Sequence, residues 1–173
     1  MTETKREFKW FWAWNDEREE AWLREMAQQG WHLTKAGAFG TYTFEKEAPK
    51  DVVYRLDFRL RDVDKAEYLQ LFADAGWEHV GEMNGWQYFR FFFNDTATTE
   101  IYTDDASKIK KYQRLLLFLT IVLSILSTSL FNLNEDLSPL MRVVNLISAG
   151  LMLLHIYAMI RLFLRIQELK KAL

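Results

Sequence analysis

The distribution of hydrophobic residues divides the chain near residue 114. Before this point, apolar residues occur in short periodic sets among dense charges. After it, residues 115–131 and 143–160 contain no Asp, Glu, Lys or Arg. As helices these stretches would be roughly 26 and 27 Å long, close to the ~30 Å thickness of a bilayer core. We therefore predict a two-helix transmembrane hairpin over residues 115–165, with spans of about 115–133 and 143–163.

The alternative for these stretches is a pair of buried helices in a soluble protein, which would be expected to show a polar stripe. The polar residues in the first stretch are small hydroxyls such as Ser124 and Ser127, which can bond back to their own helix. In the second stretch, Asn145 and His155 are the polar exceptions. Their simplest role is hydrogen bonding between helices, which could also join two copies of the hairpin in a homodimer.

Most basic residues that flank the predicted hairpin lie on one side of it. Those expected to anchor it are Lys110, Lys111, Arg114, Arg161 and Arg165. The connecting loop instead carries Glu135 and Asp136 against Arg142. By the positive-inside rule, both ends of the chain are expected in the cytoplasm, as a multi-pass protein of the cell membrane with residues 166–173 as a cytoplasmic tail. Residues 1–9 are charged and lack the apolar core of a signal peptide.

Strand and helix periodicities alternate in the first 92 residues. Tyr54, Leu56, Phe58 and Leu60 alternate with charged residues, which predicts a half-buried strand, and residues 8–14 are expected to form a similar strand. A helix follows each strand, with Asp16 and Glu19 as a capping box in the first copy and Asp64 and Glu67 in the second. The apolar stripes are Trp22, Leu23 and Met26, and Tyr68, Leu69 and Phe72.

Each predicted helix is followed by a glycine and a hairpin. Gly30 and Gly76 stand where a left-handed residue ends a helix. The hairpins are expected over residues 31–35 with 40–46, and 77–82 with 85–91. Asn84-Gly85 is a strong signal for the second turn.

These elements repeat without a gap at a period of 46 residues. Gly30-Trp31 falls on Gly76-Trp77, and Tyr42 falls on Tyr88. We therefore predict an α+β domain over residues 1–92, a duplicated βαββ unit with a mainly antiparallel sheet and helices on one face. The repeat units are about 8–46 and 54–92, and residues 93–114 form a linker and juxtamembrane segment.

Composition narrows the function classes. The net charge of −2 gives no basic footprint for nucleic acid, and the absence of cysteine excludes disulfides, thiolate metal sites and a cysteine nucleophile. There is no phosphate loop, dinucleotide fingerprint or HExxH motif. We expect no cofactor, no metal and no catalysis.

Three sets of polar residues remain as candidates for a catalytic or binding site. The acidic cluster Asp16, Glu17, Glu19 and Glu20 is either an acid/base or cation site, or a helix N-terminus that complements the macrodipole. His32 and His79 could form a pair, but they are one register apart and would point to opposite faces of a strand. The strand face of Arg55, Arg59 and Arg61 is either an anion site or a solvated face.

The tryptophans suggest a ligand pocket. A small sheet domain with 7 Trp can leave an aromatic-walled cleft between its two halves, although most of these residues are expected in the core. The candidate lining residues are Trp12, Trp14, Trp31, Trp77 and Trp86.

Several short segments of the sequence together resemble those of a known family. They are Phe11-Trp12-Ala13-Trp14-Asn15-Asp16-Glu17, Gly30-Trp31-His32-Leu33, Tyr54-Arg55-Leu56-Asp57-Phe58, Ala75-Gly76-Trp77-Glu78 and Gly85-Trp86-Gln87-Tyr88-Phe89-Arg90. This combination is similar to an uncharacterised bacterial family, the domain of unknown function (DUF) 2812, over residues 8 to about 114. The resemblance implies a C-terminal membrane segment in many members, and it implies no activity or catalytic residues.

One stretch departs from the family's pattern. Residues 94–103, NDTATTEIYT, read as the translation of a common sequencing-library adapter. We interpret Phe91 to Thr99 as foreign to the native protein, and the alternative is a natural loop. A clean genomic read that contains the stretch would contradict this interpretation.

Together these features favour a membrane-anchored cytoplasmic binding or regulatory module. The lipid bilayer is its expected partner, with a further protein or a second copy bound through the hairpin. One alternative is an accessory subunit of a membrane complex such as an exporter. A second alternative is an enzyme with an unrecognised acid/base site.

Overall fold

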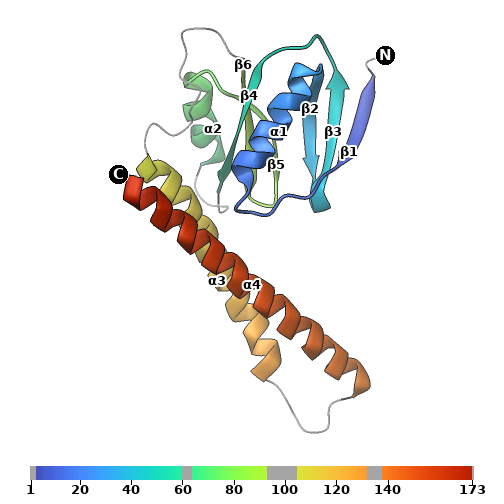
Figure 1. The fold of residues 1–173 in the computed structure, drawn as a ribbon, viewed down its shortest axis with the longest axis vertical. Coiled ribbons are helices and arrows are strands. Elements are labelled where there is room, and N and C mark those ends of the chain that lie inside the picture. The colour runs from blue at the N-terminus through green and yellow to red at the C-terminus, as the bar shows by residue number, and fades with distance from the viewer. Residues whose placement is uncertain (1–2, 60–63, 93–104, 132–137, 173) are drawn as a thin grey trace. The chain divides into compact units, whose positions relative to one another are not determined.

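The computed structural model describes residues 3–59, 64–92, 105–131 and 138–172. The chain forms two compact units, Met1–Thr103 and Asp104–Leu173. The elements of the first unit are β1 (Thr4–Phe8), α1 (Asp16–Gln28), β2 (Trp31–Gly37), a 3-10 turn (Ala38–Gly40), β3 (Thr41–Lys46), β4 (Val52–Phe58), α2 (Lys65–Asp74), β5 (Glu78–Met83) and β6 (Trp86–Phe92) (Figure 1). The second unit contains α3 (Asp105–Phe131) and α4 (Pro139–Ala172).

Two antiparallel three-stranded sheets organise the first unit. Their strand orders are β1-β3-β2 and β4-β6-β5, so each sheet places the last strand of its hairpin in the centre. This confirms the α+β class and the antiparallel pairing. The expectation of one sheet with helices on one face is wrong, because each hairpin pairs with the strand that precedes its own helix.

The second sheet is covered on both faces. Val52, Tyr54 and Leu56 join the core cluster that contains Leu23 of α1 and Phe44 of β3. On the opposite face of the sheet, Val53, Phe89 and Phe91 form a second cluster with Phe72 of α2 and with Trp77. The prediction that this strand is half-buried is therefore wrong, because α2 packs on the face that its polar residues occupy.

The first strand is shorter and earlier than residues 8–14. Phe8 lies opposite Thr41, the first residue of β3, and the N–H of Lys9 donates to the carbonyl of Gly40 over 2.8 Å. Beyond Gly40 the partner strand has turned away. Residues 9–14 therefore have no strand opposite them and leave the sheet to reach α1.

Local turn chemistry confirms several predicted positions. Gly30 and Gly76 have φ of 83° and 84°, as expected for glycines that end helices. Asn84 and Gly85 have φ of 51° and 87°, which fits a two-residue hairpin turn. Asp64 caps α2 through bonds from the N–H groups of Ala66 and Glu67, as predicted.

The two halves do not keep a constant spacing. Register shifts between Leu33 and Lys35 and between His79 and Gly81 are 46 residues apart. However, Phe8 pairs with Thr41, whereas Phe58 pairs with Trp86, so the first strands are offset by 50 residues and the last by 45. The prediction of an ungapped alignment is therefore wrong at these strands. At the last strands the reason is that the second hairpin turn is one residue shorter than the first.

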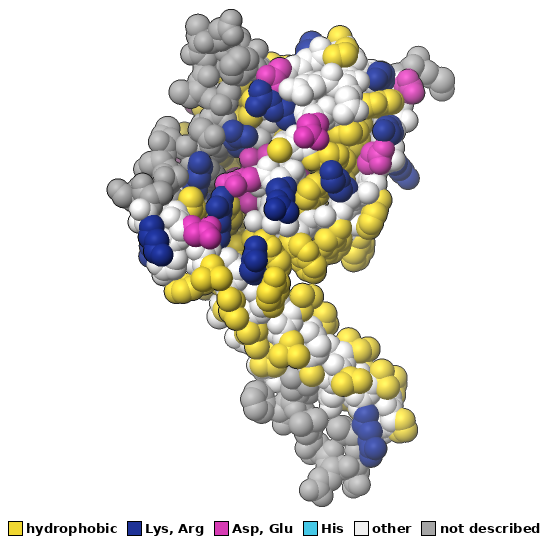
Figure 2. All heavy atoms as spheres, viewed as in Figure 1, with side chains coloured by type: hydrophobic (Ala, Val, Ile, Leu, Met, Phe, Trp, Pro, Cys, Tyr) yellow, Lys and Arg dark blue, Asp and Glu magenta, His cyan; other side chains and the backbone are white. Residues whose placement is uncertain are grey.

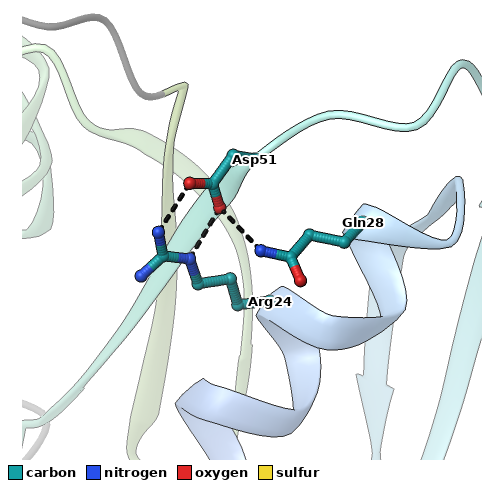
Figure 3. Close-up of polar contacts among 3 residues, drawn as sticks. All are labelled: Arg24, Gln28 and Asp51. Carbon is teal, nitrogen blue, oxygen red and sulfur yellow. Dashed lines mark hydrogen bonds and ion pairs between the residues drawn. The ribbon is translucent and has the colours of Figure 1, made fainter.

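Helix α1 lies along the open edge of β4. The N–H of Leu56 donates to Oε1 of Glu20 over 2.8 Å, and the N–H of Lys50 donates to the carbonyl of Ala27. Arg24 forms a bidentate pair with Asp51, which also accepts a bond from Gln28 (Figure 3). These contacts fix the helix against the start of β4 and cover backbone groups that an edge strand would otherwise expose.

In the second unit, α3 and α4 pack side by side (Figure 1). Within the described residues, the segment Pro139–Lys171 is long and apolar enough to cross a membrane, and its most apolar stretch of 18 residues has a mean hydropathy of 2.0. Figure 2 shows hydrophobic side chains along the exposed surface of these helices. The hydroxyls of Thr120, Ser124 and Ser127 bond back to carbonyls of α3, as expected of small polar residues in an apolar helix.

Candidate functional site

A buried carboxylate connects three elements of the first unit. Glu19 on α1 is 7% exposed, and its Oε1 accepts the hydroxyl of Tyr42 over 2.8 Å and that of Tyr88 over 2.7 Å. Tyr42 belongs to β3 of the first sheet and Tyr88 to β6 of the second. One carboxylate oxygen of α1 therefore accepts a hydrogen bond from a strand of each sheet.

The ionisation of this cluster is displaced from its ordinary range. Burial raises the pKa of Glu19, although the two tyrosine hydroxyls oppose the shift, and Asp16 raises it further. Burial also raises the pKa of Tyr42 and of Tyr88, and the nearby Glu19 carboxylate adds to both shifts. The tyrosines therefore remain protonated hydrogen-bond donors at physiological pH.

The structure divides the predicted acidic cluster. Asp16, Glu19 and Glu20 are buried, whereas Glu17 is exposed. The N-cap of α1 is Asn15, so Asp16 is the first helical residue. The predicted capping box of Asp16 and Glu19 is wrong, because Glu19 turns into the core to meet the tyrosines.

Glu20 has a separate role from Glu19. It lies 3.3 Å from Arg55 and accepts the N–H of Leu56 on the edge of β4. Two adjacent glutamates of α1 thus serve two different contacts. The helix dipole alone does not account for burying three acids in the first turns of a helix, and sequence periodicity gave no signal of this packing.

His32 and His79, considered above as a possible pair, have separate partners. Nε2 of His32 lies 3.1 Å from the carbonyl oxygen of Ala48, and Nε2 of His79 lies 3.0 Å from Oε1 of Gln87. The ring of His79 also packs against Phe89, on the face covered by α2. Among the described residues, no group of three His, Cys, Asp or Glu side chains could hold a metal ion.

The arginine face of β4 is occupied by protein. Arg55 pairs with Glu20, the guanidinium of Arg59 lies 4.3 Å from the ring centroid of Tyr68, and Asp57 accepts the hydroxyl of Tyr68 over 2.9 Å. Arg61 lies outside the described residues. The face expected to be solvated or anion-binding is thus largely taken up by contacts to α1 and α2.

The five tryptophans of the predicted cleft lie in separate environments. Trp12 and Trp14 stack on each other at 5.3 Å, whereas Trp31 lies beneath the ammonium groups of Lys5 and Lys46. Trp77 is buried under α2, and Trp86 packs edge-on against Phe58. The structure brings the first pair together and distributes the other three over both sheets.

A depression that the sequence reading missed lies on the outer face of the first sheet. It has a volume of about 540 Å³, and its lining includes Arg6, Phe8, Lys35, Ala38 and Thr43. Arg6 and Lys35 flank Thr43 on the three paired strands, and in the next row Phe8 and Gly37 flank Thr41. The cross-strand register that assembles these rows, including the shift between Leu33 and Lys35, could not be read from periodicity alone.

Phe8 lines this depression, and two further exposed aromatic residues, Trp10 and Phe39, follow lining residues closely along the chain. Phe8, Trp10 and Phe39 are 70%, 53% and 79% exposed. Phe39 has φ of 58°, a left-handed conformation that is unusual for a bulky residue. Gly40 follows it and packs so closely that an added β-carbon would lie 2.6 Å from the carbonyl oxygen of Lys9 and 3.4 Å from the Cα of Trp10.

The predicted anchoring residues lie at one end of the helix pair. Lys110, Lys111 and Arg114 are on the first turns of α3, and Arg161 and Arg165 are on the last third of α4. Figure 1 shows these ends of the two helices beside each other. Asn145 and His155 both lie on α4, and Nδ1 of His155 lies 3.0 Å from the carbonyl oxygen of Leu151 on its own helix.

Phe91, assigned above to a foreign stretch, is part of the fold. It pairs with Val53 and packs against Trp77 with ring centroids 5.3 Å apart. Phe92 pairs with Val52 at the end of β6. The rest of the suspected foreign stretch, residues 93–99, lies outside the described residues.

Comparison with known proteins identifies the family. Neither a curated protein nor a solved structure matches the chain. A family described as protein of unknown function (DUF2812) matches residues 15–124, which is more than half of the chain and includes α1, the second sheet and most of α3. The chain therefore belongs to the DUF2812 family.

Proposed function

We propose that this protein is a membrane-anchored binding or regulatory module, without catalytic activity, whose first unit lies in the cytoplasm. The observation that carries the proposal is α4, a helix that follows an α+β unit and whose most apolar stretch of 18 residues has a mean hydropathy of 2.0. The most apolar stretch of this helix is not buried inside the protein. A lipid environment would therefore remove its apolar side chains from contact with water.

A two-helix hairpin is the form of anchor we propose. In support, α3 packs along α4, and basic residues gather where α3 begins and α4 ends. This charge distribution favours both chain ends in the cytoplasm. We also propose that the first unit arose by duplication, supported by two sheets with the same strand order and by two register shifts 46 residues apart.

The absence of cysteine makes the topology directly testable. Single variants Ser138→Cys, Glu25→Cys and Lys170→Cys would be treated with a membrane-impermeant maleimide in intact cells. We expect labelling at position 138 alone until the cells are permeabilised. Labelling at position 170 in intact cells would contradict the orientation, and release of the full chain by alkaline carbonate would contradict the anchor.

The binding role needs a partner. Chemical crosslinking in native membranes with the full chain, followed by purification, should yield a defined second protein or a homodimer. Recovery of the monomer alone, together with failure of the first unit to bind any lipid or small molecule, would contradict a binding module.

An accessory subunit of a membrane complex is the second candidate, favoured by the exposed apolar surface of α4. In that case the helices would make the essential contacts. Removal of residues 1–107 should then leave association with the complex intact, whereas a module that works through its first unit should lose its partner.

A further inference from the structure

The outer face of the first sheet combines cations with exposed aromatic rings. Arg6 and Lys35 are both exposed and flank Thr43, so their side chains leave the same face of the sheet two strands apart, roughly 10 Å between backbones. Neither forms an ion pair with another described residue, in contrast to Lys5, which pairs with Glu7 over 2.7 Å. The face therefore presents two cations without an ion pair beside Thr43, with the carboxylate residue Glu45 in the adjacent row.

The backbone brings three exposed aromatic residues, Phe8, Trp10 and Phe39, to one end of this face. Phe8 is in the row next to Arg6, and the close approach of Gly40 to Lys9 and Trp10 places the Phe39–Gly40 turn beside the chain that leaves β1. In Figure 2, hydrophobic side chains gather along the side of the first unit where β1 leads into α1. We call Arg6, Phe8, Trp10, Lys35 and Phe39 the basic-aromatic tip.

The two hairpin turns of the first unit offer an internal comparison. Both contain a residue of positive φ followed by a glycine of positive φ, Phe39–Gly40 in one and Asn84–Gly85 in the other. Asparagine suits this conformation, whereas a bulky aromatic side chain does not. An exposed phenylalanine in the less favourable position contributes nothing to the core, and a backbone outlier of this kind points to a function outside the fold.

We propose that the basic-aromatic tip docks onto the surface of an anionic phospholipid membrane, with Phe8, Trp10 and Phe39 entering the headgroup region and Arg6 and Lys35 binding lipid phosphates. The inference rests on the membrane anchoring proposed above. That anchor would hold the first unit close to a bilayer, so even a weak contact would be populated. Aromatic rings prefer the interface of a bilayer, and the cytoplasmic leaflet is negatively charged.

A probe at the turn tests the contact. Phe39→Cys in the full chain would carry an environment-sensitive fluorophore, and the chain would be reconstituted in nanodiscs that contain nitroxide-labelled lipid. We expect strong quenching in phosphatidylglycerol discs and weak quenching in phosphatidylcholine discs. The matched control is Asn84→Cys, at the corresponding turn of the second sheet, which should remain unquenched in both lipids.

Charge variants test the role of the cations. In the Phe39→Cys background, Arg6→Gln and Lys35→Gln should each weaken docking on anionic discs about fivefold. Arg18→Gln removes an exposed cation from α1 and should leave docking unchanged. Equal loss in all three variants would overturn the assignment of phosphate binding to Arg6 and Lys35.

A third probe separates the two proposals. Leu153→Cys on α4 should be quenched by lipid at any headgroup charge if the helix is in the bilayer. Quenching at position 153 without quenching at position 39 would overturn the docking and leave the anchor standing. No quenching at position 153 would overturn the anchor and the docking with it, and equal quenching at positions 39 and 84 would overturn the specific role of the tip.

Discussion

Tyr42 and Tyr88, which belong to different sheets, donate their hydroxyls to the same carboxylate oxygen of Glu19. The two donors come from positions 23 and 69 residues along the chain from their acceptor. This shared acceptor links the two sheets through α1, whereas the N–H of Leu33 in β2 donates directly to the hydroxyl of Tyr54 in β4 over 3.2 Å.

Replacement of either tyrosine by phenylalanine is expected to destabilise the first unit. Tyr42→Phe and Tyr88→Phe should each lower the free energy of unfolding by about 1–3 kcal/mol, because each removes a buried hydrogen bond to Glu19. Their effects should not add, since the remaining hydroxyl can adjust to the shared acceptor. All tryptophans of the chain lie in the first unit, so tryptophan fluorescence during denaturation of the detergent-solubilised full chain reports this unit. Additive losses would show that the two bonds are independent.

The raised pKa of Glu19 predicts how stability depends on pH. The unfolded chain ionises near the ordinary value of 4.5, whereas the folded protein holds the proton to higher pH because the side chain is buried. The contribution of Glu19 is therefore fully present below 4.5 and is lost as pH rises through the folded pKa. Glu19→Gln removes this titration, so the wild type should lose stability relative to the variant as pH rises. A stability difference that is constant with pH would contradict the shift.

The pair of Arg24 and Asp51 is expected to contribute little despite its short distances. Both side chains are more than a third exposed, at 44% and 38%, so water and salt screen the attraction. Arg24 also lowers the pKa of Asp51, so the contribution exists above the unfolded value of 3.8 and fades as pH falls below it. A double-mutant cycle of Arg24→Gln with Asp51→Asn should give a coupling of at most about 1 kcal/mol at low salt. A larger coupling that survives high salt would show that the pair is better shielded than its exposure indicates.

The same substitution, glycine to alanine, is expected to change the free energy of unfolding differently at two positions in the second half of the first unit. Gly76 has φ of 84°, and an added β-carbon would lie 3.1 Å from Cε2 of Phe91, so Gly76→Ala should cost about 1 kcal/mol or more. Gly81 has no atom within 4 Å of that position and no positive φ, so Gly81→Ala should stay within about 0.5 kcal/mol of the wild type. Denaturation of the full chain measures both. Equal effects would contradict the left-handed conformation at Gly76.

Features set by a few neighbouring residues could be predicted from the sequence. Gly30, Gly76, the Asn84-Gly85 turn and the Asp64 cap all depend on the conformational preferences of single residues. The apolar stripe of α1 likewise identified the buried residues Leu23 and Met26 in the second half of that helix.

Features set by distant contacts could not be predicted. The end of β1 depends on where β3 begins, and the burial of Asp57 depends on Tyr68 in α2. The role of Glu19 depends on two tyrosines in two strands, so the local pattern suggested only a capping residue. The basic-aromatic tip likewise required the pairing of three strands, which a period of 46 residues does not specify.

The strained turn predicts a trade between stability and membrane contact. Phe39→Asn places at the first turn the residue type of the second, and it should raise the free energy of unfolding by about 0.5–1 kcal/mol, because asparagine tolerates a φ of 58°. The reverse change, Asn84→Phe, should lower it by a similar amount. With a fluorophore on Ala38→Cys, which is also exposed at this turn, Phe39→Asn should reduce quenching on anionic nanodiscs severalfold. Unchanged stability with unchanged quenching would contradict both the strain and the use of Phe39. A gain in stability with a loss of quenching would show that the exposed ring is retained for contact with lipid at a cost to the fold.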